Sequence, residues 1–227
     1  MKKKGISVLS GGLDSVVATS VYAKEYEITA ITFNYGQQSF EQELKASKII
    51  CDKMGMEHVV IDLPWLKKIS NSSLTNDKEI PKVDYDDLDN PDKSFNSAKS
   101  VWVPARNTIF SSIALAFAES NHAEIIIVGW DYEEAVTFPD NSKEYLEAFN
   151  ETIKYGSFDD ITIKAPLIDM SKEEIVQTGI KYNAPMELSY SCYEGTDLHC
   201  GICESCKRRK RAYINAKIED PTEYLNK

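Results

Sequence analysis

Short apolar runs alternate with longer amphipathic segments from the start of the chain. The runs at 6–9, 28–33 and 58–63 have the length of buried strands, and the segments 13–24 and 40–54 between them carry apolar residues at helical spacing. Strand, helix, strand, helix, strand at this spacing predicts parallel βαβ units. We therefore predict an α/β fold built on an open, doubly wound parallel sheet.

The same alternation returns after residue 104. Ser171 and Glu174 have the spacing of a capping box, which marks the start of one further helix. The predicted elements are a helix over 105–120, a strand over 124–128, a helix over 142–154, a strand over 161–164 and a helix over 171–178.

Between these two halves lies a polar insertion at about 71–100. It has little periodicity, and it holds seven acidic residues and two prolines. A solvated insertion and a mobile lid over an active site both fit this composition. No helix or strand is predicted there.

Composition limits the class of protein. With 227 residues, 42% hydrophobic and 27% charged, the chain has room for one sizeable α/β domain and a small lobe. A net charge of −10 disfavours nucleic acid as a partner. No segment approaches the ~20 apolar residues of a membrane span, and the run at 6–9 is too short for a signal peptide. We expect a cytoplasmic protein whose five cysteines stay reduced.

The run Ser10-Gly11-Gly12-Leu13-Asp14-Ser15 follows the first predicted strand and opens the first predicted helix, where an open α/β sheet binds its ligands. Adjacent glycines let an anion reach the main-chain N–H groups, and the helix dipole favours it. Ser10 and Ser15 add hydroxyl donors, and Asp14 can hold Mg²⁺ against the phosphates. A polar turn that merely caps the helix is the alternative. The other common phosphate loops, Gly-x-x-x-x-Gly-Lys-Ser/Thr and Gly-x-Gly-x-x-Gly, are absent from the sequence.

A cysteine cluster marks the C-terminal part of the chain. Four thiolates about 2.3 Å from one ion are the ligand set of a structural zinc, and an iron–sulfur cluster is the weaker alternative. Such a closed shell has no open position for substrate, so the zinc would hold a small lobe together. The predicted ligands are Cys192, Cys200, Cys203 and Cys206. We accordingly predict a nucleotide-binding domain over 1–185 and a helical zinc-binding lobe over 186–227.

Three features beside these motifs receive a structural interpretation. His199 adjoins the cluster, and because four thiols already complete the ligand set, we expect it behind the ligands or at the surface. The fifth cysteine, Cys51, is predicted to pack in a core. Lys207 to Arg211 are five consecutive basic residues. We favour a solvated helix face for them over contact with phosphate or RNA.

The Ser-Gly-Gly-x-Asp-Ser run resembles the loop of the PP-loop ATP pyrophosphatases, which cleave ATP to AMP and pyrophosphate and transfer AMP to an acceptor. With the cysteine cluster, the chain resembles the 7-cyano-7-deazaguanine synthase family over nearly its whole length. Asn141 and Tyr190 depart from the family pattern, which has Cys and commonly Trp at these places. The other motifs that carry the resemblance are Asn34-Tyr35-Gly36-Gln37, Val103-Pro104-Ala105-Arg106-Asn107, Gly129-Trp130, Phe138-Pro139-Asp140, Ala165-Pro166-Leu167 and Ser189-Tyr190-Ser191-Cys192-Tyr193.

The resemblance implies a Rossmann-like fold of the adenine nucleotide alpha hydrolase type and an ATP-dependent ligase that forms C–N bonds. Its substrates would be ATP, ammonia and 7-carboxy-7-deazaguanine. Its product would be 7-cyano-7-deazaguanine (preQ0), for queuosine or archaeosine biosynthesis. The resemblance further implies one structural zinc per chain, Mg²⁺ with the ATP, free ammonium as nitrogen source, and a homodimer or larger oligomer.

Site residues are carried over only onto matching positions. The catalytic candidates are Asp14, Ser15 and Arg106, and the substrate-binding candidates are Tyr35, Gln37, Arg106 and Asn107. The predicted ATP-binding residues are Leu9, Ser10, Gly11, Gly12, Leu13, Asp14, Ser15, Val16, Val17 and Ala18.

Local chemistry gives physical reasons for the roles of Arg106, Tyr35 and Gln37. Arg106 at a helix start opposes the helix dipole, so an anionic partner such as a phosphate or a substrate carboxylate would explain it. Tyr35 and Gln37 can stack on and hydrogen-bond to a purine-like ring, with loop packing as the alternative. Asp131 and Asp140 follow predicted strand ends, and we expect both at the surface.

Two alternative functions remain open at this point. Another PP-loop enzyme, such as a tRNA thiolase or an amide-forming ligase, would share the loop; a thiolase needs a metal-free cysteine, and only Cys51 is available. A zinc-dependent RNA-binding module would use the basic run Lys207–Arg211, against the net charge of −10.

Overall fold

The computed structural model describes residues 2–76, 78–82, 84–88 and 90–226. Its centre is a parallel sheet in the order β3-β2-β1-β4-β5, which confirms the predicted α/β fold. Between β1 and β4 the strand order reverses, and an open α/β sheet binds its ligands at such a point. The strands are β1 (Lys3–Val8), β2 (Tyr26–Asn34), β3 (Glu57–Asp62), β4 (Ile125–Ile127) and β5 (Thr162–Lys164), each within a few residues of its predicted place.

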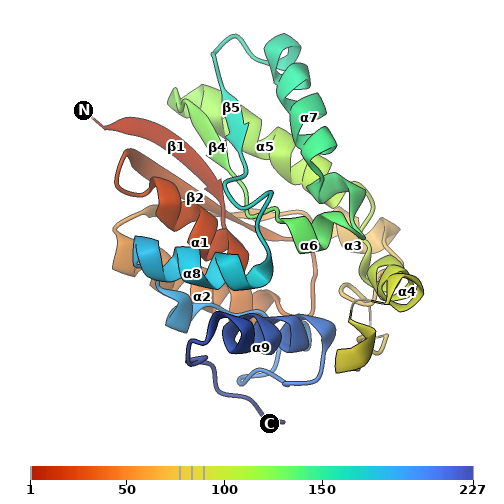
Figure 1. Ribbon diagram of the computed structural model, residues 1–227. Coiled ribbons are helices and arrows are strands. Elements are labelled where there is room, and N and C mark those ends of the chain that lie inside the picture. The colour runs from red at the N-terminus through yellow and green to blue at the C-terminus, as the bar shows by residue number, and fades with distance from the viewer. Residues whose placement is uncertain (1, 77, 83, 89, 227) are drawn as a thin grey trace.

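Helices cover both faces of the sheet (Figure 1). Strand β4 shows why, because alternate side chains of a strand point to opposite faces. Ile125 and Ile127 join one buried cluster, and Ile126 joins the other. The first cluster lies under α1 (Leu13–Tyr22), α2 (Phe40–Met54) and α8 (Lys172–Tyr182), and the second under α5 (Arg106–Asn121) and α7 (Lys143–Gly156).

The insertion at 71–100 is less irregular than its composition indicates. A helix, α4 (Pro91–Val101), fills its last part, so the prediction of no regular element there is wrong. Proline stands in the first turn, and the Asn90 side chain accepts hydrogen bonds from the N–H groups of Asp92 and Lys93. Asn-Pro is a helix-start signal, but the helix after it carries only three apolar residues, Phe95, Ala98 and Val101, among polar ones.

The remaining elements are short. They are α3 (Pro64–Ile69), α6 (Tyr132–Ala135) and the 3₁₀ turns η1 (Tyr85–Asp87), η2 (Pro139–Asn141) and η3 (Met186–Leu188). None of these was predicted, because one helical turn is too short to show a hydrophobic period.

Helix α9 (Glu204–Ala216) closes the molecule beside α8 (Figure 1). The predicted capping box of α8 is confirmed: the Ser171 hydroxyl accepts from the Glu174 N–H, and the Glu174 carboxylate accepts from the Ser171 N–H. Buried Ala212 and Tyr213 of α9 belong to the same apolar cluster as α1. The domain boundary at 185 stays a prediction, and the two proposed parts share one core.

No helix in the described part of the chain combines the length and the apolar character needed to cross a membrane.

Candidate active site

The phosphate loop lies at the carboxyl end of β1, as predicted. Gly11 has φ +82°, and a Cβ there would come within 2.9 Å of the Glu43 carbonyl oxygen, so a glycine is required. Gly12 is the N-cap of α1 and has no side chain to cap it. The first N–H groups of α1 are therefore left for an anion, which the helix dipole also attracts.

Two serines brace the loop from within. The Ser10 hydroxyl accepts from the Gly12 N–H at 3.2 Å and lies 3.2 Å from the Ser15 hydroxyl. Ser15 Oγ donates to the Gly12 carbonyl at 3.0 Å. These hydroxyls surround the N-terminus of α1, where they could be redirected to a bound phosphate.

The end of β4 approaches the same loop. A Cβ on Gly129 would come within 2.7 Å of the Ser15 nitrogen, so only glycine lets β4 pass this close to α1. Trp130 and Asp131 follow Gly129 directly in the chain. In this way β4 brings residues of a distant segment to the phosphate loop.

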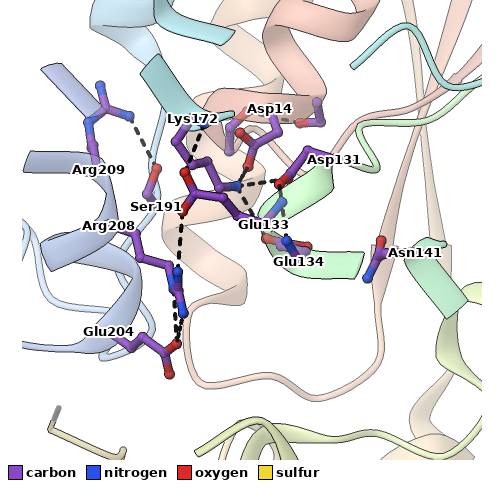
Figure 2. A network of polar contacts seen from close by, with 12 residues as sticks. Asp14, Asp131, Glu133, Glu134, Asn141, Lys172, Ser191, Glu204, Arg208 and Arg209 are labelled. Atoms are coloured by element: carbon purple, nitrogen blue, oxygen red, sulfur yellow. Dashed lines mark hydrogen bonds and ion pairs between the residues drawn. The ribbon is translucent and has the colours of Figure 1, made fainter. Parts of the chain in front are cut away.

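A buried lysine gathers three carboxylates beside the loop (Figure 2). Lys172 Nζ donates to Asp14 Oδ2 at 2.8 Å and to Asp131 Oδ2 at 2.9 Å, and it lies 3.4 Å from Glu134 Oε1. We call Asp14, Asp131 and Glu134 the carboxylate cluster. One ligand oxygen from each of them lies within 4.8 Å of the others.

Charge does not balance in this cluster. Burial raises the pKa of Asp131, Lys172 lowers it, and Glu134 and Asp14 raise it again, so that the pKa is raised to about 7. Burial also raises the pKa of Asp14. Burial alone would lower the pKa of Lys172, but the three carboxylates outweigh it and raise that pKa well above its usual value. One lysine thus faces three acids, which favours a further cation.

A single buried atom supports this conclusion. Asp14 Oδ1 is buried and has no hydrogen-bond partner within the described residues. A buried carboxylate oxygen without a partner is costly, and a divalent cation is a ligand it can hold. The carboxylate cluster and this free oxygen therefore fit the predicted Mg²⁺ at Asp14.

Farther along the same cavity lie Arg106, Tyr35 and Asn107. Arg106 opens α5, as predicted, and its Nη1 donates to the Tyr35 hydroxyl at 3.2 Å. Burial lowers the pKa of this guanidinium, but Tyr35 and Asp140 raise it to well above its usual value, so the group stays charged. The buried Asn107 amide lies 3.4 Å from the Asn141 side-chain oxygen. These groups can hold a carboxylate and a polar ring edge.

Five of the predicted site residues do not line the cavity: Gly11, Val16, Val17, Ala18 and Gln37. Gln37 is buried, and its amide nitrogen donates to the Phe33 carbonyl and to Glu43 Oε2 at 2.9 Å. Glu43 lines the cavity in its place. Val16, Val17 and Ala18 are fully buried in the core under α1 and do not line the cavity.

The C-terminal segment completes the cavity wall. Tyr190, Ser191, Tyr193 and Ser205 all line it. The Tyr190 N–H donates to the Gly11 carbonyl at 2.8 Å, which joins this segment to the phosphate loop directly.

The four predicted metal ligands come together as one buried group. A tetrahedral site with metal–sulfur bonds of ~2.3 Å has sulfur–sulfur edges of about 3.8 Å, and Cys200 Sγ lies 3.9 Å from Cys206 Sγ. Main-chain N–H groups of residues 194, 200, 202 and 203 point at the sulfurs of Cys192 and Cys200. This four-cysteine cluster is consistent with zinc.

Cys51 and His199 have the expected structural places. Cys51 is 1% exposed, and burial raises its thiol pKa to about 12, which is unsuited to a sulfur-transfer nucleophile. His199 is buried, and its Nε2 accepts from the Ser191 N–H at 2.9 Å. The thiolase alternative loses its only cysteine by this finding.

Two expectations are wrong. Asp131 is fully buried and Asp140 nearly so, although both were expected at the surface. Asp131, just after β4, is bonded to the buried Lys172, and Asp140 lies in η2 beside Asn107 of α5. The basic run on α9 is no solvated face either. Arg209 is 3% exposed and donates to Ser189 and Ser191, and the other four pair with acidic or carbonyl groups of the chain.

Sequence reasoning missed Lys172, Glu134 and Glu43. Lys172 lies 158 positions from Asp14, and nothing local distinguishes it from a surface lysine in the first turn of a capped helix. A lysine there opposes the helix dipole, as Arg106 does, and this signal could have been used.

A parallel sheet, an uncapped helix N-terminus at its switch point and a carboxylate cluster beside it are the features of an α/β enzyme that binds a nucleotide. The chain belongs to the QueC family: the model of the family "Queuosine biosynthesis protein QueC" matches residues 4–217.

Relatives match nearly the whole length of the chain. It is 73% identical over 224 residues to a 7-cyano-7-deazaguanine synthase of Methanosphaera stadtmanae, covering 99% of each chain. It is 65% identical to that of Methanobrevibacter smithii, with the same coverage. It is 49% identical to that of Methanothermobacter thermautotrophicus, over 97% of this chain and 99% of the relative.

Proposed function

We propose that the chain converts 7-carboxy-7-deazaguanine, ammonia and ATP into 7-cyano-7-deazaguanine, a step of 7-deazaguanine biosynthesis. The observation that carries the proposal is one continuous cavity with the phosphate loop and carboxylate cluster at one place and the Arg106 guanidinium at another. Membership of the QueC family and the full-length relatives support the same reaction.

The chemistry requires the acid to be activated. A carboxylate is a poor electrophile, because its oxygen would have to leave as an oxide dianion. Attack of that oxygen on the α-phosphorus of ATP breaks the bond to pyrophosphate and makes AMP the later leaving group. Ammonia then attacks the acyl carbon, AMP leaves and a proton is lost, giving the amide.

A second activation converts the amide to the nitrile. The amide oxygen attacks the α-phosphorus of another ATP, and pyrophosphate leaves again. Loss of AMP and of the remaining nitrogen protons forms the carbon–nitrogen triple bond. Both activations are the same reaction at phosphorus, so one phosphate loop serves both.

The chain's contribution is to position and to stabilise charge. Main-chain N–H groups at the start of α1 face the pyrophosphate, with the hydroxyls of Ser10 and Ser15 beside them. The Lys172 ammonium does not line the cavity, and its bond to Asp14 holds that carboxylate in place beside the phosphate loop. Asp14, Asp131 and Glu134 would hold Mg²⁺, which neutralises charge on the phosphates.

The acid substrate is assigned to the other part of the cavity. The Arg106 guanidinium would pair with the carboxylate, and the Tyr35 hydroxyl holds that guanidinium in place. The side chain of Asn107 faces the same space and would bond to the ring edge. The four-cysteine cluster has no open ligand position, so zinc would stabilise the fold and take no part in the reaction.

Product analysis tests the proposal. The purified protein is incubated with MgATP, ammonium and 7-carboxy-7-deazaguanine, and products are identified by mass spectrometry. We expect 7-cyano-7-deazaguanine, with the amide as a transient species. The proposed function would be refuted if the protein binds MgATP but forms no nitrile, either from the acid or when the amide is supplied directly.

A further inference from the structure

Helix α6 and its N-cap, Asp131, carry two members of the carboxylate cluster, yet the helix itself buries no side chain. It spans only Tyr132–Ala135. Tyr132 is 58% exposed, and Val136 just after it is 70% exposed. One main-chain bond, from the Tyr132 N–H to the Met170 carbonyl at 3.4 Å, ties the turn to the rest of the chain. A single helical turn with no buried side chain is not stable by itself.

Glu133 attaches this turn to α9, and it adds a bond to α8 beside those that Asp131 and Glu134 make to Lys172. Its Oε1 accepts from the Lys172 N–H at 3.0 Å, at the N-terminus of α8, where a carboxylate also complements the helix dipole. Its Oε2 pairs with Arg208 at 3.2 Å and with Arg211 at 2.9 Å, both on α9. Figure 2 shows this carboxylate between the guanidinium of Arg208 and the carboxylate cluster. One half-buried side chain therefore joins α6, α8 and α9.

The carboxylates that would bind Mg²⁺, Asp131 and Glu134, lie on either side of Glu133 in the sequence. Asp131 caps α6 through Oδ1 and meets Lys172 through Oδ2, and Glu134 lines the cavity. Glu133 itself does not line the cavity. A displacement of its carboxylate would move Asp131, Glu134 and the backbone of Lys172 together, because all three are adjacent to it in sequence or bonded to it.

We propose that Glu133 is a positioning residue for the nucleotide site: held by Arg208 and Arg211, it fixes the carboxylate cluster, and so makes MgATP binding depend on helix α9. The helix begins next to the cysteine cluster, with Cys203 as its N-cap. A metal site with no part in the reaction is thereby connected to the nucleotide site through one helix turn and one carboxylate. The inference rests on the proposed function only in taking MgATP as the ligand of the carboxylate cluster.

The test is equilibrium dialysis of MgATP against Glu133→Gln and the unmodified protein, with no acceptor present. Glutamine keeps the volume and can still accept from the Lys172 N–H, but it loses the ion pairs to α9. Outer groups that orient metal ligands contribute about 10- to 100-fold to affinity, and we expect MgATP to bind at least about tenfold more weakly. Because no acceptor is used, failure to form nitrile would leave this result unchanged.

Glu204→Gln is the matched control. Glu204 is 14% exposed, close to the 19% of Glu133, and it also pairs with Arg208, at 2.9 Å. Its second partner is the Ser97 hydroxyl, so it contacts α4 and not α6. We expect Glu204→Gln to bind MgATP within about twofold of the unmodified protein, with zinc content unchanged in both variants.

Two outcomes would overturn the proposal. The first is MgATP binding by Glu133→Gln within about twofold of the unmodified protein, which would make Glu133 an ordinary ion-pair partner. The second is equal weakening in Glu204→Gln, which would indicate a general loosening of α9. If Glu133→Gln does not fold, Arg211→Gln is used instead: about threefold weaker binding supports the proposal, and unchanged binding contradicts it.

Discussion

The cysteine cluster and the carboxylate cluster are both candidate metal sites, and they are built in opposite ways. The four thiols come from one stretch of the chain and are all buried, and their sulfur atoms lie within 4.8 Å of one another. The three carboxylates come from α1 and α6, share their space with the Lys172 ammonium, and two of them line the cavity. One site is closed by its own ligands, and the other is left open for phosphates.

Charge explains this difference. A thiolate cluster without a metal has no cation of its own, so its ion is part of the folded state. The carboxylate cluster has Lys172, which partly balances it and keeps it ordered before ATP arrives. We therefore expect a permanent ion at the first site and, at the second, an ion that comes and goes with the nucleotide.

The largest effect should follow from Asp14→Ala. This change removes the carboxylate nearest the phosphate loop, and we expect turnover to fall by about 10³-fold, as when a transition-state charge partner is lost. Zinc content should stay the same, and Tm should change by no more than about 3 °C. Pyrophosphate release, metal analysis and calorimetry measure the three quantities. Turnover within about tenfold of the unmodified protein would remove Asp14 from the site.

Cys203→Ser should reverse this pattern. Structural zinc contributes about 10–16 kcal/mol in small domains, so the share of one ligand is about 3–4 kcal/mol. For a chain of this size we expect zinc content to fall and Tm to drop by about 10 °C. Metal analysis with a thermal melt checks both. Full zinc occupancy in this variant would take Cys203 out of the ligand set.

Much of this contrast is visible in the sequence. The cysteine spacing identifies all four ligands, because a closed site made from one segment is a local pattern. The phosphate loop is also local, and so is the capping box that begins α8. The carboxylate cluster is not local, since Asp131 and Lys172 reach Asp14 only through the order of the strands. Asp131 was expected at the surface because the three-residue strand before it gives no sign of where its end lies.

The basic run on α9 shows the same limit. Five consecutive charges look solvated, but Arg209 is buried and bonded to Ser189 and Ser191. The other four basic side chains pair with acids and carbonyl groups, most of them from distant segments, and no local pattern reveals these partners. Charge alone did not distinguish a solvated helix face from one that holds the C-terminal segment in place.

Arg106→Lys tests whether the part of the cavity at Arg106 binds the acid substrate and not ATP. Lysine keeps the charge but cannot make a paired contact with a carboxylate, and the bond to the Tyr35 hydroxyl would change. We expect KM for 7-carboxy-7-deazaguanine to rise by about 10- to 30-fold, the value of one charge-assisted bond, while KM for ATP changes little. Steady-state kinetics with each substrate varied in turn gives both values. An increase confined to ATP would place Arg106 on the phosphates instead.

The carboxylate cluster should also respond to pH near neutrality. The pKa of Asp131 is raised to about 7, so a proton competes with Mg²⁺ below that pH. We expect MgATP affinity to increase several-fold between about pH 6 and pH 8.

The contribution of Asp131 to folding stability changes with pH in the opposite direction. It falls as pH rises from about 4 toward 7, because only the folded state then keeps the proton. Dialysis across this range is the measurement, and a flat profile would contradict the assignment.

The smallest expected effect concerns RNA. Since all five basic side chains of Lys207–Arg211 have partners within the chain, RNA should bind weakly, with little change between low and high salt. Filter binding at two salt concentrations measures this. Tight, steeply salt-dependent binding would revive an RNA-binding role for α9.

The most direct test of the account is the stoichiometry of the complete reaction. One phosphate loop that activates first the acid and then the amide predicts two AMP and two pyrophosphate for each 7-cyano-7-deazaguanine formed. Quantification of AMP, pyrophosphate and nitrile in a single reaction gives the ratio. A ratio of one AMP per product, with the amide as the end product, would contradict it.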